Sequence, residues 1–75
     1  SAELHKINHL IRERKKFLRG EVKRLAGWQR KTGKYILRNA GSVDRLTVKF
    51  HKETSRALIE ARARLKELQR LCNTF

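Results

Sequence analysis

RERKKFLRGEVKRLAGWQRKTGKYILR, residues 12–38, is the segment that decides the fold, because it combines dense positive charge with a helical hydrophobic pattern. It contains eleven Lys or Arg residues and two acids, and so carries +9 of the chain's net charge of +13. Apolar residues recur within it at helical spacing, among them Leu18, Val22 and Leu25. A disordered basic tail lacks this pattern. The segment therefore predicts a helix with a strongly positive surface.

The composition of the whole chain favours long helices. Proline is absent, and the good helix formers Glu, Lys, Arg, Leu and Ala dominate. Hydrophobic residues make up 39% of the chain, more than disordered chains usually contain. Seventy-five residues form one domain at most, and the small core of such a chain favours oligomerisation. We therefore expect a single all-α domain over residues 1–75 that self-associates.

A first helix is predicted over about residues 2–39. The hydrophobic pattern continues across Gly33 to Tyr35 and Ile36, so the helix is expected to continue through this glycine. The alternative is a helix that ends at Gly33, followed by a short middle helix over residues 34–39. The predicted apolar face of the first helix consists of Leu4, Ile7, Ile11, Leu18, Val22, Leu25 and Trp28, widened by Leu10 and Phe17.

The clearest boundary in the chain follows Asn39. Gly41 is a helix stop, Ser42 is a candidate cap, and Asp44 suits the first turn of a next helix, so a turn is predicted at residues 40–42. A second helix is then expected over about residues 43–72. Its predicted inner face consists of Val43, Leu46, Phe50, Ala57, Ala61, Leu65, Leu68 and Cys72.

Two long helices with one tight connection describe an antiparallel helical hairpin. One contact between the helices does not cover all the apolar residues, because Trp28, Tyr35, Phe50 and Ile59 are left over. Pairing of two hairpins into a four-helix arrangement would cover them, so a homodimer is expected. The alternative is that the chain is a fragment that packs on another region of a longer protein.

The charge indicates a polyanionic partner, with nucleic acid as the leading candidate. At an isoelectric point near 11.2 and a net charge of +13, like charges destabilise the compact state unless a partner neutralises them. The expected contact is with the phosphates of a duplex, with little sequence specificity. The second helix carries eight cations and four acids and is expected to contribute less. The predicted binding residues are Arg12, Lys16, Arg19, Lys23, Arg30, Lys31, Lys34, Arg38, Gly20 and Gly27.

The two glycines among these cations have two explanations. Small residues between long cations would let a phosphate backbone come close to Gly20 and Gly27, but a close helix crossing, or plain tolerance of glycine, explains them equally well. Duplex RNA is slightly favoured over duplex DNA, because duplex RNA is recognised mainly by shape and phosphates. The alternative function is a protein-interaction or scaffold module whose basic helix binds an acidic protein or an anionic membrane surface.

Other classes of function have weak support. No combination of nucleophile, base and orienting group stands out, so we expect no enzymatic activity, no small-molecule substrate and no cofactor. His5, His9 and Glu13 share one helical face, but the neighbouring cations argue against a metal site. The single Cys72 cannot form an internal disulfide and is expected to be a buried thiol. With no long apolar run, we expect no transmembrane segment and a location in the cytoplasm or nucleus.

Overall fold

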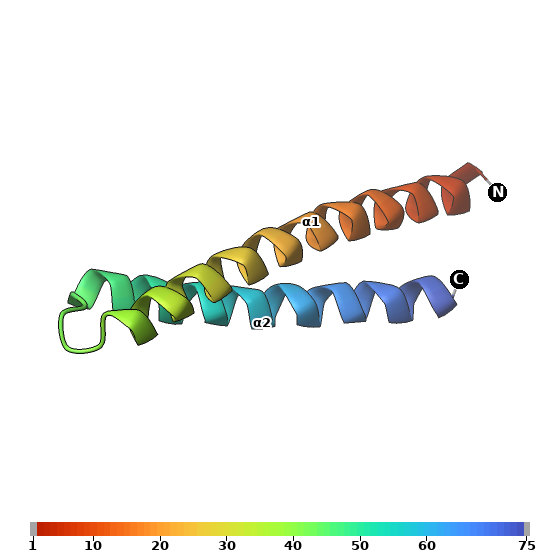
Figure 1. Cartoon of the computed structure of the whole chain (residues 1–75). Helices are drawn as coiled ribbons and strands as arrows, with labels where there is room; N and C mark the ends of the chain where they lie inside the picture. The colour runs from red at the N-terminus through yellow and green to blue at the C-terminus, as the bar shows by residue number, and fades with distance from the viewer. Residues whose placement is uncertain (1, 75) are drawn as a thin grey trace.

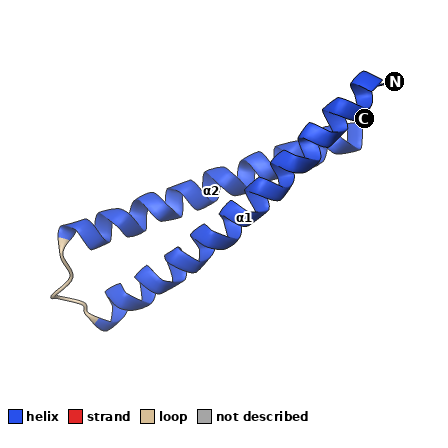
Figure 2. Ribbon diagram, turned by 90° about the horizontal axis from the view of Figure 1, so that it is seen from above, coloured by secondary structure: helices blue, strands red, loops and turns tan. Residues whose placement is uncertain are grey.

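In the computed structural model the chain folds into two helices joined by one loop (Figure 1; Figure 2). The structure describes residues 2–74, and the side chains of residues 2–71. α1 spans Ala2–Arg38 and α2 spans Arg45–Thr74, with no strand in residues 2–74. Both views place the start of α1 and the end of α2 at one end of the molecule and the loop at the other. The predicted all-helical hairpin is confirmed.

α1 is one uninterrupted helix through Gly33, so the alternative of a break at this glycine is wrong. The apolar pattern that continues to the half-buried Ile36 keeps this part of α1 packed on α2. A Cβ added at Gly33 would lie 3.5 Å from Cε1 of His51, which is ordinary contact. Gly33 therefore lies where α1 faces α2.

The loop over residues 39–44 ends α1 at a glycine, as predicted. Gly41 has a φ of 93°, a backbone conformation that favours glycine because it has no Cβ. The Ser42 amide donates to the Asn39 carbonyl oxygen at 2.9 Å, and the Ser42 hydroxyl donates to the same oxygen at 3.1 Å. Ser42 thus stabilises the turn.

Asp44 caps α2, which corrects the predicted cap at Ser42 and moves the start of the helix from Val43 to Arg45. Oδ1 of Asp44 accepts a hydrogen bond from the backbone N–H of Thr47 at 2.8 Å. This N–H belongs to the first turn, where no helical carbonyl is available to accept it. The hydrogen bond from Thr47 lowers the pKa of Asp44 below its ordinary value.

Replacement of Asp44 with alanine is expected to lower the melting temperature, whereas Asp44→Asn should retain most of it, because asparagine caps helices as well as aspartate. The pKa of Asp44 is lower in the folded chain than in the unfolded chain. The stabilisation from its charge is therefore present above the unfolded pKa and is lost as the pH falls through the folded value. Thermal unfolding followed by circular dichroism should show a gap between wild type and Asp44→Ala that narrows in acid. A gap that does not change with pH would contradict this prediction.

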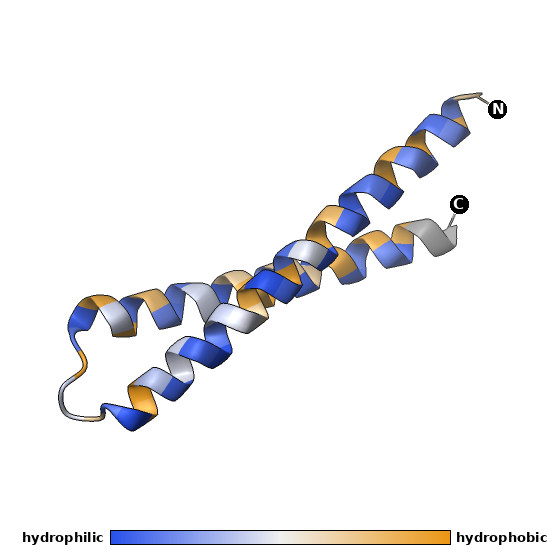
Figure 3. Cartoon of the chain, turned by 45° about the horizontal axis from the view of Figure 1, so that its top comes forward, coloured by the Kyte–Doolittle hydropathy of each residue, from blue (hydrophilic) through white to orange (hydrophobic). Residues whose placement is uncertain are grey.

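The contact between the helices follows a seven-residue repeat. In both helices the least exposed residues recur alternately three and four positions apart, which is the spacing of the a and d positions of a coiled coil. The a positions include Val22 and Leu58, and the d positions include Leu18 and Ala61. We call the full set the seam: Ile11, Lys15, Leu18, Val22, Leu25, Gln29, Thr32 and Ile36 of α1, and Thr47, His51, Thr54, Leu58, Ala61, Leu65 and Leu68 of α2. Figure 3 shows the matching alternation of hydrophobic and hydrophilic segments along both helices.

Apart from Lys15, the seam is apolar in the half near the chain ends, and apart from Ile36 it is polar in the half near the loop. Nε2 of Gln29 donates to the Ser55 hydroxyl at 3.2 Å, and Oγ1 of Thr32 lies 2.6 Å from Nδ1 of His51. Polar partners at a coiled-coil contact specify one alignment of the helices, because any shift leaves them unpaired. These contacts fix which residues lie at the same height, with Gln29 beside Ser55 and Thr32 beside His51.

Part of the predicted inner faces is wrong, because several large apolar residues lie outside the seam. Leu46 is 77% exposed, and Phe50 and Trp28 are each 46% exposed, whereas Thr54 and Leu58 are buried. Near the loop the seam is mostly polar, and the large apolar residues of α2 lie beside the seam there. The hydrophobic pattern therefore indicated the wrong side of this part of α2. Other predicted inner residues that are exposed are Leu4, Ile7, Leu10 and Phe17. The side chain of Cys72 lies outside the described residues.

Candidate nucleic-acid interface

The flanks of the seam divide the hairpin into two faces. In an antiparallel pair of helices, the e positions of both helices border one side of the seam and the g positions border the other. Ser55 at an e position bonds across the first side, and the rings of Trp28 and Phe50, both at g positions, lie 6.0 Å apart on the second. We call the surface of e and b positions the basic face, and the surface of g and c positions the aromatic face.

The basic face contains nine cations and no acid. None of the seven acids of the chain occupies an e or b position. All nine cationic side chains are exposed. They are Arg12, Lys16, Arg19, Lys23 and Arg30 of α1, and Arg45, Lys52, Arg62 and Lys66 of α2. Both helices therefore build this surface.

Three ion pairs among the described residues lie away from the basic face. Each of them joins residues one helical turn apart on the same helix: Arg24 with Glu21 at 2.9 Å, Arg70 with Glu67 at 3.3 Å, and Lys49 with Glu53 at 4.0 Å. The hydrogen bonds that the Arg24 guanidinium donates to the Glu21 carboxylate raise the pKa of Arg24. Carboxylates thus neutralise cations elsewhere on the hairpin, and the basic face keeps an uncompensated positive charge.

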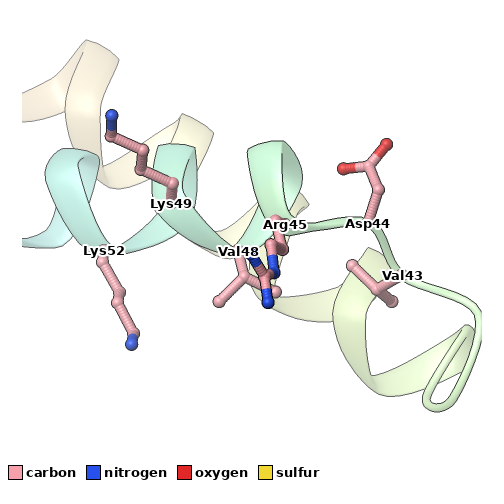
Figure 4. Close-up of a pocket in the computed structure, with 6 residues that line it drawn as sticks. All are labelled: Val43, Asp44, Arg45, Val48, Lys49 and Lys52. Carbon is pink, nitrogen blue, oxygen red and sulfur yellow. The ribbon is translucent and has the colours of Figure 1, made fainter.

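The end of the basic face near the loop is shown in Figure 4. Arg45, Val48 and Lys52 occupy successive b, e and b positions and, together with Val43, Asp44 and Lys49, line a shallow pocket where α2 begins. In the view Arg45, Val48 and Lys52 point to the same side of α2, whereas Lys49, at an f position, points to the opposite side. The seven-residue repeat therefore sorts the cations of α2 between the basic face and the outer edge of the hairpin.

Five of the ten predicted binding residues lie on the basic face, namely Arg12, Lys16, Arg19, Lys23 and Arg30. Lys31 and Arg38 occupy c positions on the aromatic face, and Nζ of Lys31 lies 5.6 Å from the centre of the Trp28 ring. Lys34 occupies an f position on the outer edge of α1. The sequence-based prediction did not include the four cations of α2. It considered only the total charge of this helix and not the side on which each charge lies. The heptad pattern identifies them, because the acids of α2 occupy only c positions and so leave the e and b positions with cations alone.

Gly20 and Gly27 also occupy f positions, on the outer edge of α1. A Cβ added at either glycine would meet no atom within 4 Å, so the explanation by a close crossing with α2 is wrong. Gly20 lies in a hollow lined in part by Glu13 and Glu21. These two carboxylates outnumber Lys16, the one cation that also lines the hollow, so the local charge does not favour a nucleic-acid backbone at Gly20. The basic face does not depend on either glycine.

Metal and membrane sites were also considered. Among the described residues no group of three or more His, Cys, Asp or Glu side chains could hold a metal ion. His5 and His9 occupy e and b positions, in line with the cations of α1. Neither helix, over its described residues, has a stretch long and apolar enough to span a bilayer. Comparison with protein-family models, curated proteins and solved structures finds no match for this chain.

Proposed function

We propose that the protein is a non-enzymatic binder of double-stranded nucleic acid, in the cytoplasm or nucleus, and that the basic face makes the contact. The observation that carries this proposal is the separation of charge between the two faces. The basic face has nine cations and no acid, whereas the aromatic face has five cations and five acids and thus no net charge. A surface with one sign of charge and no internal ion pairs attracts a polyanion most strongly.

A duplex suits the basic face better than a single strand does. The cations of α1 extend from Arg12 to Arg30, roughly 27 Å at 1.5 Å per residue, and α2 supplies a second row beside them. Two rows on a stiff support match phosphates held at fixed positions. Proteins that bind single strands use aromatic side chains for base stacking. The four aromatic residues among the described side chains, Phe17, Trp28, Tyr35 and Phe50, all lie on the aromatic face.

The contact is expected to involve phosphates, with little reading of bases. The hairpin measures 60 × 15 × 15 Å, and so both helices together are wider than the major groove of B-DNA, which is about 12 Å wide. Base edges are read mainly by clustered Arg, Asn and Gln side chains inside a groove, and over residues 2–71 the basic face has one Gln and no Asn. A wide and shallow minor groove, as in A-form RNA, accommodates such a surface, which slightly favours duplex RNA.

A comparison of duplex RNA, duplex DNA and single strands of one sequence tests this function. Fluorescence anisotropy is expected to show tighter binding to the duplexes, similar affinities for unrelated duplex sequences, and a steep loss of affinity with salt. Stronger binding to single strands would contradict the proposal. No binding to any of them at about physiological salt would favour the alternative, a module that binds an acidic protein or an anionic membrane.

We also propose that the chain forms a homodimer with a four-helix arrangement. Its accessible surface is 6415 Å², whereas a compact monomer of 8.9 kDa exposes about 4,800 Å². The hairpin thus exposes about 1,600 Å² more than a compact chain of the same mass, and stable complexes bury roughly 800 Å² per partner. A second copy can therefore cover a surface of the required size.

A further inference from the structure

Exposed apolar side chains gather on the aromatic face. Eight of the eleven large hydrophobic residues that are exposed occupy its g and c positions: Ile7, Leu10, Phe17, Trp28, Tyr35, Leu46, Phe50 and Leu71. Trp28 and Phe50 meet edge to face across the seam and form an aromatic centre within this surface. An extended apolar surface of this kind marks a site of association between proteins.

The charges on the outer edges of the aromatic face are sorted by helix. The c positions form these edges, because they lie furthest from the seam on this side. Along α1 they hold three cations at seven-residue intervals and one acid, Glu3, near the start of the helix, and along α2 they hold three acids at the same interval. The cations are Arg24, Lys31 and Arg38, and the acids are Glu53, Glu60 and Glu67. The c positions of one edge are therefore mainly cationic and those of the other acidic, although Arg24, Glu53 and Glu67 also pair with neighbours on their own helix.

We propose that a second copy of the chain covers the aromatic face, with α1 of each copy lying on α2 of the other. This inference rests on the proposed self-association and specifies its surface and symmetry. The two-fold axis runs parallel to the helices, between the copies. A rotation about this axis keeps every residue at its own height along the rod. It places the positive edge of each copy beside the negative edge of the other.

The heights of the charged residues agree with this arrangement. Because Gln29 lies beside Ser55, Lys31, two residues after Gln29, is at the height of Glu53, two residues before Ser55. The contact between Thr32 and His51 gives the same height to within one residue. By the same contact between Gln29 and Ser55, Arg24, five residues before Gln29, is at the height of Glu60, five residues after Ser55. Within one chain these cations and acids lie on opposite edges of the face. In the proposed dimer, Lys31 of one copy lies beside Glu53 of the second copy, and Arg24 beside Glu60.

The other two-fold arrangement, with α1 on α1 and α2 on α2, brings like charges together. It would place Arg24, Lys31 and Arg38 of the two copies along one edge, and like charges at short distance are destabilising. An acidic protein is a poorer occupant as well, because the aromatic face has no net charge to attract it. In the proposed arrangement the two basic faces lie on opposite outer sides, so dimer formation leaves both accessible to nucleic acid.

Charge exchange at one pair of positions tests the arrangement. Sedimentation equilibrium of the full chain without nucleic acid compares wild type, Lys31→Glu, Glu53→Lys and the double variant, with circular dichroism as the measure of folding. Each single change is expected to weaken dimerisation by about tenfold or more, because both copies exchange an attractive contact for a repulsive one. The double variant should return close to wild type. Lys34→Glu, on the outer edge of α1, is the matched control and should not weaken the dimer.

The possible results are distinguishable. A tighter dimer in Lys31→Glu would show that α1 packs on α1 and would overturn the arrangement. If both single variants dimerise more weakly and the double variant does not regain the wild-type dimer affinity, the arrangement is overturned as well. A wild-type chain that stays monomeric at micromolar concentration would overturn the self-association itself, without bearing on duplex binding. Disulfide formation between copies gives an independent readout in Cys72→Ser chains. Lys31→Cys combined with Glu53→Cys should cross-link, whereas Lys31→Cys alone should not.

Discussion

Replacement of Leu58 with alanine is expected to destabilise the hairpin by about 2–5 kcal/mol, the range for truncation of a buried leucine. Leu58 is 1% exposed and occupies an a position of the seam. Among the described side chains only Leu18, Ala61 and Thr54 are buried with it. With so few buried groups, the loss of one large side chain removes a major share of the apolar contact. Urea unfolding followed by circular dichroism would measure the change.

Leu37→Ala is the matched control, because it makes the same chemical change on the surface. Leu37 is 81% exposed and occupies a b position, away from both the seam and the aromatic face. Its substitution is expected to change the free energy of unfolding by no more than about 0.5 kcal/mol. Equal losses in Leu58→Ala and Leu37→Ala would mean that the seam does not stabilise the fold.

The two helices were predictable because local signals agree with the tertiary contact over most of the chain. Leu18, Val22 and Leu25 repeat at helical spacing, and the loop has a glycine where a positive φ is needed. The seam near the loop was not predictable in the same way. There Thr32 and His51 form the contact, while Phe50 lies on the flank. A hydrophobic pattern indicates the buried side of a helix only where that side is apolar.

The candidate site was predictable on α1 but not on α2. Along α1 the predicted residues from Arg12 to Arg30 share e and b positions, so helical spacing alone groups them. The contribution of α2 depends on which of its sides borders the e positions of α1, and the helix pairing decides this. Lys31 and Arg38 were assigned to the binding surface by net charge. Their c positions place them on the opposite face, beside the aromatic residues.

A defined binding face has a consequence that diffuse positive charge does not have. Removal of two cations from the basic face should weaken duplex binding more than removal of two cations elsewhere. Arg19→Ala with Lys23→Ala removes two exposed cations from the α1 part of the basic face. Lys49→Ala with Arg56→Ala removes the same charge from f positions on the outer edge of α2. Both double variants should stay helical and dimeric, because none of these side chains belongs to the seam or the aromatic face.

The salt dependence of duplex binding by these two double variants tests the central claim most directly. Each phosphate neutralised by a cation releases counterions, so the slope of log affinity against log salt changes by about 0.9 for each contact. The Arg19→Ala and Lys23→Ala variant is expected to lose about 1.8 from the slope, almost equally for unrelated duplex sequences. The Lys49→Ala and Arg56→Ala variant should keep the wild-type slope. Equal changes in slope for both variants would show that the hairpin attracts nucleic acid through its total charge, without a defined face.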